Sequence, residues 1–218
     1  MDSDLEVYSV FGGRGAGKTT NVKNLLSDDE RKRIAVYDVK DEYPFKKIHG
    51  KAQLVKFLKA NWHKDFKISY VPSAKEKKQH IAECSEFCYM LVHGQKRDYK
   101  QGKGSNITIV VEEMSLSAPN QNYPEGQAGF EYAVNIAREW GVEIIGVSQR
   151  PAQANADFRG NATQCYYLRL LDQLDMKAVK EKLGNAAFDL KNLKPHEYFL
   201  FNVDGLSRGK NKLSKRHA

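Results

Sequence analysis

Residues 12 to 19 read Gly-Gly-Arg-Gly-Ala-Gly-Lys-Thr and fit the pattern G-x-x-x-x-G-K-[ST] completely. Glycines let such a loop curl so that its backbone N–H groups face a phosphate, and the helix that follows adds its dipole. Lys18 is then expected to reach the β- and γ-phosphates, and the Thr19 hydroxyl to ligate Mg²⁺. The residues expected to bind the nucleotide are Gly12, Gly13, Arg14, Gly15, Ala16, Gly17, Lys18, Thr19 and Thr20. The pattern predicts a site for Mg²⁺ and a nucleoside triphosphate, with ATP as the expected substrate.

A second, acidic element is needed, because a carboxylate at the end of an apolar strand also serves the metal of such a loop. Residues 107–111, Ile-Thr-Ile-Val-Val, are apolar and β-branched, and Glu112 and Glu113 follow them directly. We expect Glu112 to hold Mg²⁺ through a water molecule and Glu113 to polarise the attacking water as a catalytic base. The alternative interpretation is an ordinary acidic junction between a strand and a surface loop.

These side chains require a scaffold that brings the ends of several strands together. Strands are expected at residues 6–11, 33–39, 67–71, 107–112, 142–147, 163–170 and 197–203. Helices are expected at 17–26, 52–62, 74–93, 128–140 and 173–183, with a short helix opening at Pro151 and a loop over 116–127. Repeated strand-then-helix order predicts an α/β fold with a mostly parallel central sheet flanked by helices. The strands at 33–39 and 67–71 are expected to lie between the glycine-rich loop and the acidic strand. An inserted strand there, with a Glu beside the metal-binding acid, is typical of three-layer, RecA-like P-loop NTPases with an additional strand, an analogy at the level of fold.

The composition favours a polyanionic partner. Lys and Arg number 35 against 27 Asp and Glu, a formal net charge of +8 in 218 residues. Basic surfaces bind nucleic acid by releasing counterions, although the same charge can serve solubility alone. The excess is concentrated at residues 205–218, which contain no acid, and at residues 94–106. We expect both segments to be mobile and to contact phosphates rather than read bases. The candidate DNA contacts in the second segment are Lys96, Arg97, Lys100 and Lys103.

Several other classes of protein are disfavoured. No stretch has the length of a membrane span, and the acidic beginning of the chain does not resemble a secretory signal. Three cysteines do not make a disulfide framework and suit a reducing compartment. His80, Cys84 and Cys88 share one helical face, but a fourth ligand and a tight Cys pair are missing. We therefore expect buried structural cysteines.

Residues 137–151, Ala-Arg-Glu-Trp-Gly-Val-Glu-Ile-Ile-Gly-Val-Ser-Gln-Arg-Pro, resemble the FtsK–HerA superfamily of DNA-translocating ATPases. In that superfamily a helix ends in Arg and Gly, and the apolar strand that follows closes with Ser-Gln-Arg-Pro or Thr-Gln-Arg-Pro. Residues 37–43, Tyr-Asp-Val-Lys-Asp-Glu-Tyr, are similar to an Asp-x-x-x-Glu-Tyr stretch of HerA-like members. The resemblance covers residues 6–203. One departure is Glu112-Glu113 where the family usually has Asp-Glu, which leaves open which glutamate takes which role.

The resemblance implies roles for two more residues. Gln149 would be the polar sensor that contacts the γ-phosphate or the attacking water, and Arg138 the arginine finger that enters a neighbour's site. A finger that acts in a neighbour requires a homo-oligomeric ring, usually a hexamer. The alternatives are a helix-capping Gln149 and a solvated Arg138 near a helix end, with Arg150 and Arg97 as other candidates for the finger.

The chain carries little beyond the motor domain, a minimal form that resembles the genome-packaging ATPases of membrane-containing icosahedral double-stranded DNA viruses. The resemblance implies a motor domain over 1–204 and a basic tail over 205–218, acting on double-stranded DNA in the host cytoplasm or at a packaging vertex of the virion. A capsid vertex or viral membrane protein would be the docking partner, and residues 94–106 and 115–127 would face the pore. A nucleotide or small-molecule kinase, a Zot-like assembly or extrusion ATPase and a nucleotide-switched scaffold are the alternatives.

Overall fold

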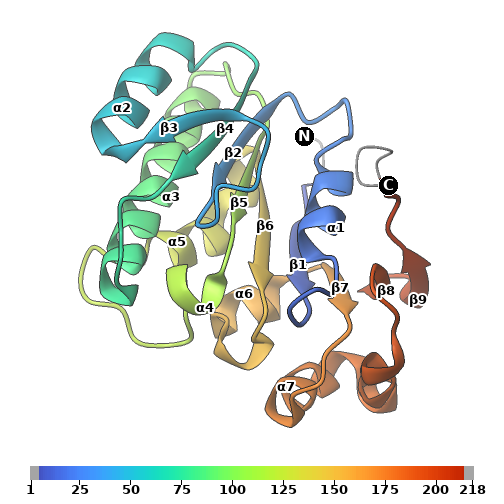
Figure 1. The fold of residues 1–218 in the computed structure, drawn as a ribbon. Helices are drawn as coiled ribbons and strands as arrows, with labels where there is room; N and C mark the ends of the chain where they lie inside the picture. Colours follow the sequence, from blue (N-terminus) through green and yellow to red (C-terminus); the bar gives the residue numbers. More distant parts are fainter. Residues whose placement is uncertain (1–4, 214–218) are drawn as a thin grey trace.

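The computed structural model describes residues 5–213, apart from the side chain of Ala137. Its centre is a nine-stranded sheet in the order β3-β4-β2-β5-β6-β1-β7-β8-β9 (Figure 1). The strands are β1 Val7–Phe11, β2 Arg33–Tyr37, β3 Lys46–His49, β4 Phe66–Val71, β5 Ile107–Val111, β6 Val142–Ser148, β7 Gln164–Leu168, β8 Glu197–Asn202 and β9 Gly205–Lys210. Strands β1 to β7 pair in parallel, and β8 and β9 are added antiparallel at one edge.

Helices cover both faces of the sheet. They are α1 Lys18–Leu25, α2 Gly50–Asn61, α3 Lys77–Lys100, α4 Met114–Ser117, α5 Gly129–Ile136, α6 Ala156–Asn161 and α7 Gln173–Leu183, with 3-10 segments η1 Ala137–Trp140, η2 Pro151–Gln153 and η3 Gly184–Asn192. Alternate residues of β2 face opposite sides: Ala35 and Tyr37 pack in the core beneath α2, α3 and α5, while Ile34 and Val36 pack beneath α1 (Figure 1). Central parallel strands buried on both faces explain the continuous apolar runs of the sequence.

The predicted three-layer α/β architecture with a mostly parallel sheet is confirmed. The additional strand between the strand of the glycine-rich loop, β1, and the acidic strand, β5, is β6. The strands predicted at residues 33–39 and 67–71 are β2 and β4, and they lie with β3 on the far side of β5, so neither is the inserted strand. The cysteines are buried and unpaired, and the His80 ring shares a hydrogen bond of 3.2 Å with the Tyr37 hydroxyl.

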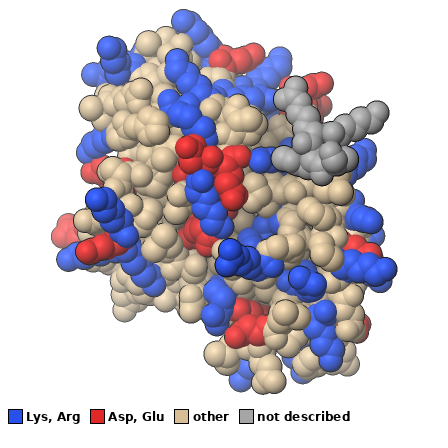
Figure 2. All heavy atoms as spheres, in the orientation of Figure 1, with Lys and Arg blue, Asp and Glu red and all other residues tan. Residues whose placement is uncertain are grey.

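Both basic segments expected to be mobile contain regular structure. Helix α3 was predicted to end at His93, but it continues to Lys100, because Gly94 lets the Trp62 ring lie directly against the helix. A Cβ atom at Gly94 would lie 2.4 Å from that ring, and the Trp62 indole donates to Asp98 one turn later at 2.6 Å. Residues 205–210 form the edge strand β9 rather than the start of a tail, and residues 214–218 lie outside the described residues. Lysine and arginine side chains are scattered over the face seen in Figure 2 rather than gathered on one element.

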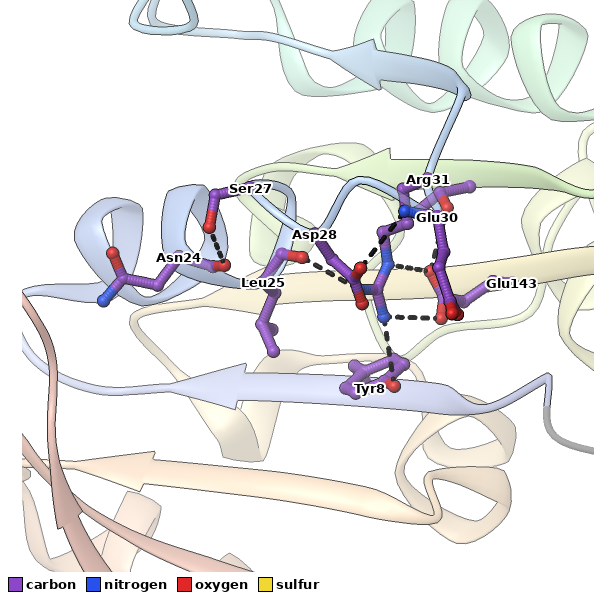
Figure 3. Close-up of polar contacts among 9 residues, drawn as sticks. Tyr8, Asn24, Leu25, Ser27, Asp28, Glu30, Arg31 and Glu143 are labelled. Atoms are coloured by element: carbon purple, nitrogen blue, oxygen red, sulfur yellow. Dashed lines mark hydrogen bonds and ion pairs between the residues drawn. The ribbon is translucent and has the colours of Figure 1, made fainter.

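The turn between α1 and β2 is tied to the amino end of the sheet by one arginine. Arg31 donates to both carboxylate oxygens of Glu143 on β6, at 2.7 and 2.8 Å, and to the Leu25 carbonyl at 2.8 Å (Figure 3). Glu143 also accepts from Thr108 on β5 at 2.8 Å. Burial by itself would lower the pKa of Arg31, but the hydrogen bonds and charge of Glu143 raise it overall. This bidentate pair fixes the end of the sheet opposite the glycine-rich loop.

Candidate active site

The glycine-rich loop lies at the carboxyl end of β1, between the ends of β6 and β7. Gly12 N–H donates to the Ser148 carbonyl at 3.2 Å, and Gly13 N–H donates to the Arg169 carbonyl at 2.8 Å. Gly17 has a φ of +100°, and a Cβ there would lie 2.5 Å from Nδ1 of His196. The loop is therefore held from both sides in a conformation that requires glycine.

Lys18 curls back over this loop. Its Nζ donates to the carbonyls of Gly12 at 2.8 Å and Gly13 at 3.1 Å, and the residue is only 8% exposed. Burial lowers the pKa of Lys18, and the nearby Glu113 carboxylate partly offsets this effect. The ammonium group is thus set inside the loop, where it can bind a phosphate.

Glu113 and Gln149 contact each other at the carboxyl ends of the neighbouring strands β5 and β6. Gln149 Nε2 donates to Glu113 Oε1 at 2.8 Å, and Lys40 Nζ contacts the same oxygen. Burial by itself would raise the pKa of Glu113, but the hydrogen bonds from Lys40 and Gln149 lower it overall. Glu113 has a φ of +49°, a left-handed conformation that sets it apart from β5. The arrangement offers an ionised carboxylate, the state that a general base requires.

Glu112 has a different environment. It is 3% exposed and accepts a hydrogen bond from the Tyr43 hydroxyl. Burial raises its pKa to about 7, an effect that the Tyr43 hydrogen bond opposes. The expected neighbour at the metal site, Thr19, donates instead to Glu42 Oε2 at 2.9 Å. The structure therefore places Lys40, Glu42 and Tyr43 at the site, three residues to which sequence reasoning gave no role, although they belong to the stretch 37–43 singled out there.

These residues suit a magnesium ion. No group of three or more His, Cys, Asp or Glu side chains within residues 5–213 is arranged to hold a metal alone. Mg²⁺ needs fewer protein ligands, because it keeps several waters and takes its other oxygens from nucleotide phosphates. The Thr19 hydroxyl would supply one ligand to the ion, and the Glu42 carboxylate lies within hydrogen-bond distance of that hydroxyl, whereas Glu112 is hydrogen-bonded to Tyr43.

Arg138 lies far from this site within the same chain. It belongs to η1, which precedes the amino end of β6, whereas Gln149 follows its carboxyl end. The seven residues of β6 separate the two ends by about 20 Å at 3.3 Å per residue. The other finger candidates are already engaged: Arg150 pairs with Asp175 at 2.7 Å, and Arg97 donates to Asp98 at 3.2 Å. Arg138 is exposed, and its side chain makes no hydrogen bond or ion pair with any other described residue.

The four candidate DNA contacts lie at the same end of the sheet as Arg138. Lys96 and Lys100 place their Nζ atoms 5.5 and 6.0 Å from the Trp140 ring centroid, on the last turns of α3. Lys103 is exposed in the short loop between α3 and β5. Within residues 5–213, no helix is both long enough and apolar enough to cross a membrane.

No protein-family model matches the sequence, and a comparison with curated proteins finds no match. Solved structures do match. The genome packaging NTPase B204 from Sulfolobus turreted icosahedral virus 2, in complex with AMPPCP, has a TM-score of 0.72 at 14% identity, over 96% of this chain and 99% of that one. The DNA-packaging ATPase B204 from Sulfolobus turreted icosahedral virus has a TM-score of 0.68 at 15% identity, over 95% and 98%. VirB4 of Thermoanaerobacter pseudethanolicus gives 0.68 at 12% identity, over 95% and 90%.

At these identities the likeness is one of fold. It confirms the P-loop NTPase fold. The neighbours include genome-packaging ATPases, the class of protein that the sequence was expected to resemble. The packaging NTPase B204 from Sulfolobus turreted icosahedral virus 2 is also known in complex with AMP and with ATP-gammaS.

Proposed function

We propose that this chain is the Mg²⁺-dependent ATPase subunit of a homo-oligomeric ring that translocates double-stranded DNA and packages a viral genome. The observation that carries the proposal is the convergence of Lys18, Glu113 and Gln149 at the ends of three adjacent strands, β1, β5 and β6. ATP as the substrate is supported by the ATP analogues bound to structural neighbours.

The chemistry follows from the contacts of these residues. Lys18 binds the β- and γ-phosphates, and Glu113 accepts a proton from the water that attacks the γ-phosphorus. Gln149, which already holds one oxygen of Glu113, orients the carboxylate and senses whether the γ-phosphate is present. Mg²⁺, when bound, neutralises charge that develops on the phosphates. Glu113 and Gln149 have no evident role in a nucleotide kinase, which is why hydrolysis is favoured over that alternative.

A ring is supported by the position of Arg138. An arginine about 20 Å from its own glycine-rich loop can stabilise phosphoryl transfer only in another subunit. The end of one subunit that carries Arg138 would then contact the glycine-rich loop of the next subunit. Such a head-to-tail, heterologous contact closes into a ring, which we take to be a hexamer. The ring would act in the host cytoplasm or at a packaging vertex, docked on a capsid vertex or viral membrane protein.

DNA would be held through its phosphates by Lys96, Arg97, Lys100 and Lys103. Such contacts are independent of sequence and weaken as salt is added. Each lysine or arginine removed should reduce the slope of log affinity against log salt by about 1, with little change in base preference.

The test is steady-state ATPase activity with and without long double-stranded DNA, at low and moderate salt, for the wild type, Lys18→Ala and Arg138→Ala. We expect DNA stimulation that salt weakens and that both variants lose. Mixing the two inactive variants should restore activity, because about a quarter of the interfaces in a random one-to-one ring pair an intact loop with an intact finger. If mixing does not restore activity, Arg138 does not act in a neighbouring subunit. If DNA does not change the ATPase activity, the proposal of a DNA-translocating motor is refuted.

A further inference from the structure

The loop between β2 and β3, residues 38–45, contacts three groups of the candidate site: the Thr19 hydroxyl and the carboxylates of Glu112 and Glu113. Glu42 accepts a hydrogen bond from Thr19, Tyr43 donates one to Glu112, and Lys40 contacts Glu113. This β2–β3 loop contains the Asp-x-x-x-Glu-Tyr stretch, which the hydrolysis scheme above leaves without a role. Three contacts from one short loop to three different catalytic candidates indicate that the loop belongs to the site.

The position of Glu42 is set by buried anchors on either side. Asp38, fully buried, accepts hydrogen bonds from the backbone N–H groups of Glu42 at 3.0 Å and Tyr43 at 3.1 Å. Asp38 also accepts from the Ser69 hydroxyl at 2.5 Å. Tyr43 is 1% exposed and packs in the core beneath α1. Glu42 itself is exposed, so its carboxylate is presented to Thr19 by a rigid loop and remains open to solvent on its other side.

We propose that Glu42, rather than Glu112, is the carboxylate that positions the Thr19 hydroxyl for Mg²⁺. A hydroxyl has one proton and two lone pairs, so a proton given to Glu42 leaves the lone pairs for the metal. Partners that orient a metal ligand in this way tune metal affinity. Glu112 is committed to Tyr43 and instead fastens the β2–β3 loop to the end of β5. The inference rests on the proposed function, because it assigns a residue within the same Mg·nucleotide site.

The test compares nucleotide binding with and without metal. The dissociation constant of a fluorescent ATP analogue is measured in Mg²⁺ and in EDTA, and Mn²⁺ binding is followed by electron paramagnetic resonance with the same nucleotide. Glu42→Ala should lower metal affinity about 10-fold or more, the usual effect of losing such a partner, while affinity in EDTA stays at the wild-type value. Glu42→Gln, whose carbonyl can still accept from Thr19, should recover part of the loss.

Two variants serve as controls. Asp41→Asn removes an acid from the same loop, at a φ of +57° that Asn tolerates, and should leave metal affinity unchanged. Glu112→Gln should keep most of the metal dependence. Wild-type metal affinity in Glu42→Ala, or its loss only in Glu112→Gln, would overturn the inference. A wild-type protein that binds no nucleotide in either buffer would instead refute the proposed function.

Discussion

Replacing Glu112 by Gln should make the free protein more stable at pH 8 and should flatten its stability profile. Burial raises the pKa of Glu112 from 4.5 to about 7, so the folded protein prefers the protonated carboxyl. The stability that this preference contributes is fully present below pH 4.5 and is lost as pH rises through 7. The difference between 4.5 and about 7 corresponds to about 3 kcal/mol. Glutamine keeps the shape of the side chain and an oxygen that can accept from Tyr43, but it cannot ionise.

Urea unfolding of nucleotide-free protein at pH 5 and pH 8 measures this effect. The wild type should lose about 2 to 3 kcal/mol more than Glu112→Gln between the two pH values, because part of the loss has already occurred at pH 5. Glu125→Gln is a matched control, because it removes an exposed carboxylate on a loop and should follow the wild type. Parallel profiles for the wild type and Glu112→Gln would refute the reasoning, since they would mean that Glu112 is already ionised in the folded state.

Three further predictions concern the loop, the base and the scaffold. Gly17→Ala should abolish nucleotide binding in a fluorescence titration, since its Cβ would lie 2.5 Å from His196, whereas Gly160→Ala, with no atom within 4 Å, should bind normally. Glu113→Gln should lower the single-turnover hydrolysis rate by about 10² to 10⁴ and leave nucleotide affinity intact; a rate within a few fold of wild type would exclude Glu113 as the base. Arg31→Met should lower the free energy of unfolding by about 3 kcal/mol, because it leaves buried Glu143 without its charged partner. Glu143→Gln added to Arg31→Met should recover part of that loss in the same urea assay.

The central fold was predictable from sequence because the central strands are buried on both faces. Runs such as Ile107–Val111 carry few polar residues and leave little choice of structure. The edge strands β3 and β9 were missed for the opposite reason: each has one face in solvent, and β3 contains only one buried residue, Ile48. The predicted end of α3 at His93 lies just before Gly94, and glycine is normally unfavourable inside a helix. Only the fold shows that the Trp62 ring occupies the space beside Gly94 that a side chain would need.

At the candidate site, the sequence predicted residues that motifs place at strand ends and missed those brought in by the β2–β3 loop. Glu113 and Gln149 follow strands that pair in parallel, so their proximity could be deduced once the strands were recognised. The contact of Glu42 with Thr19 spans 23 residues and depends on how an irregular loop, capped by Asp38, turns back over the sheet. Hydrophobic periodicity contains no information about such a turn. The one feature of the sequence that could have indicated it is the Asp and Glu of the stretch 37–43.

The placement of Arg138 also constrains how the protein could hold DNA. Trp140 belongs to the same 3-10 segment as Arg138, and Lys96 and Lys100 lie over its ring. If Arg138 enters a neighbour's active site, these two lysines accompany it to the subunit interface, where their charge would favour the bound triphosphate. Lys96 and Lys100 would then serve both the neighbour's triphosphate and the DNA phosphates, whereas Arg97 and Lys103 would contact DNA alone. Replacing the two lysines should therefore weaken both ATP hydrolysis and DNA binding, and replacing Arg97 and Lys103 should weaken DNA binding only.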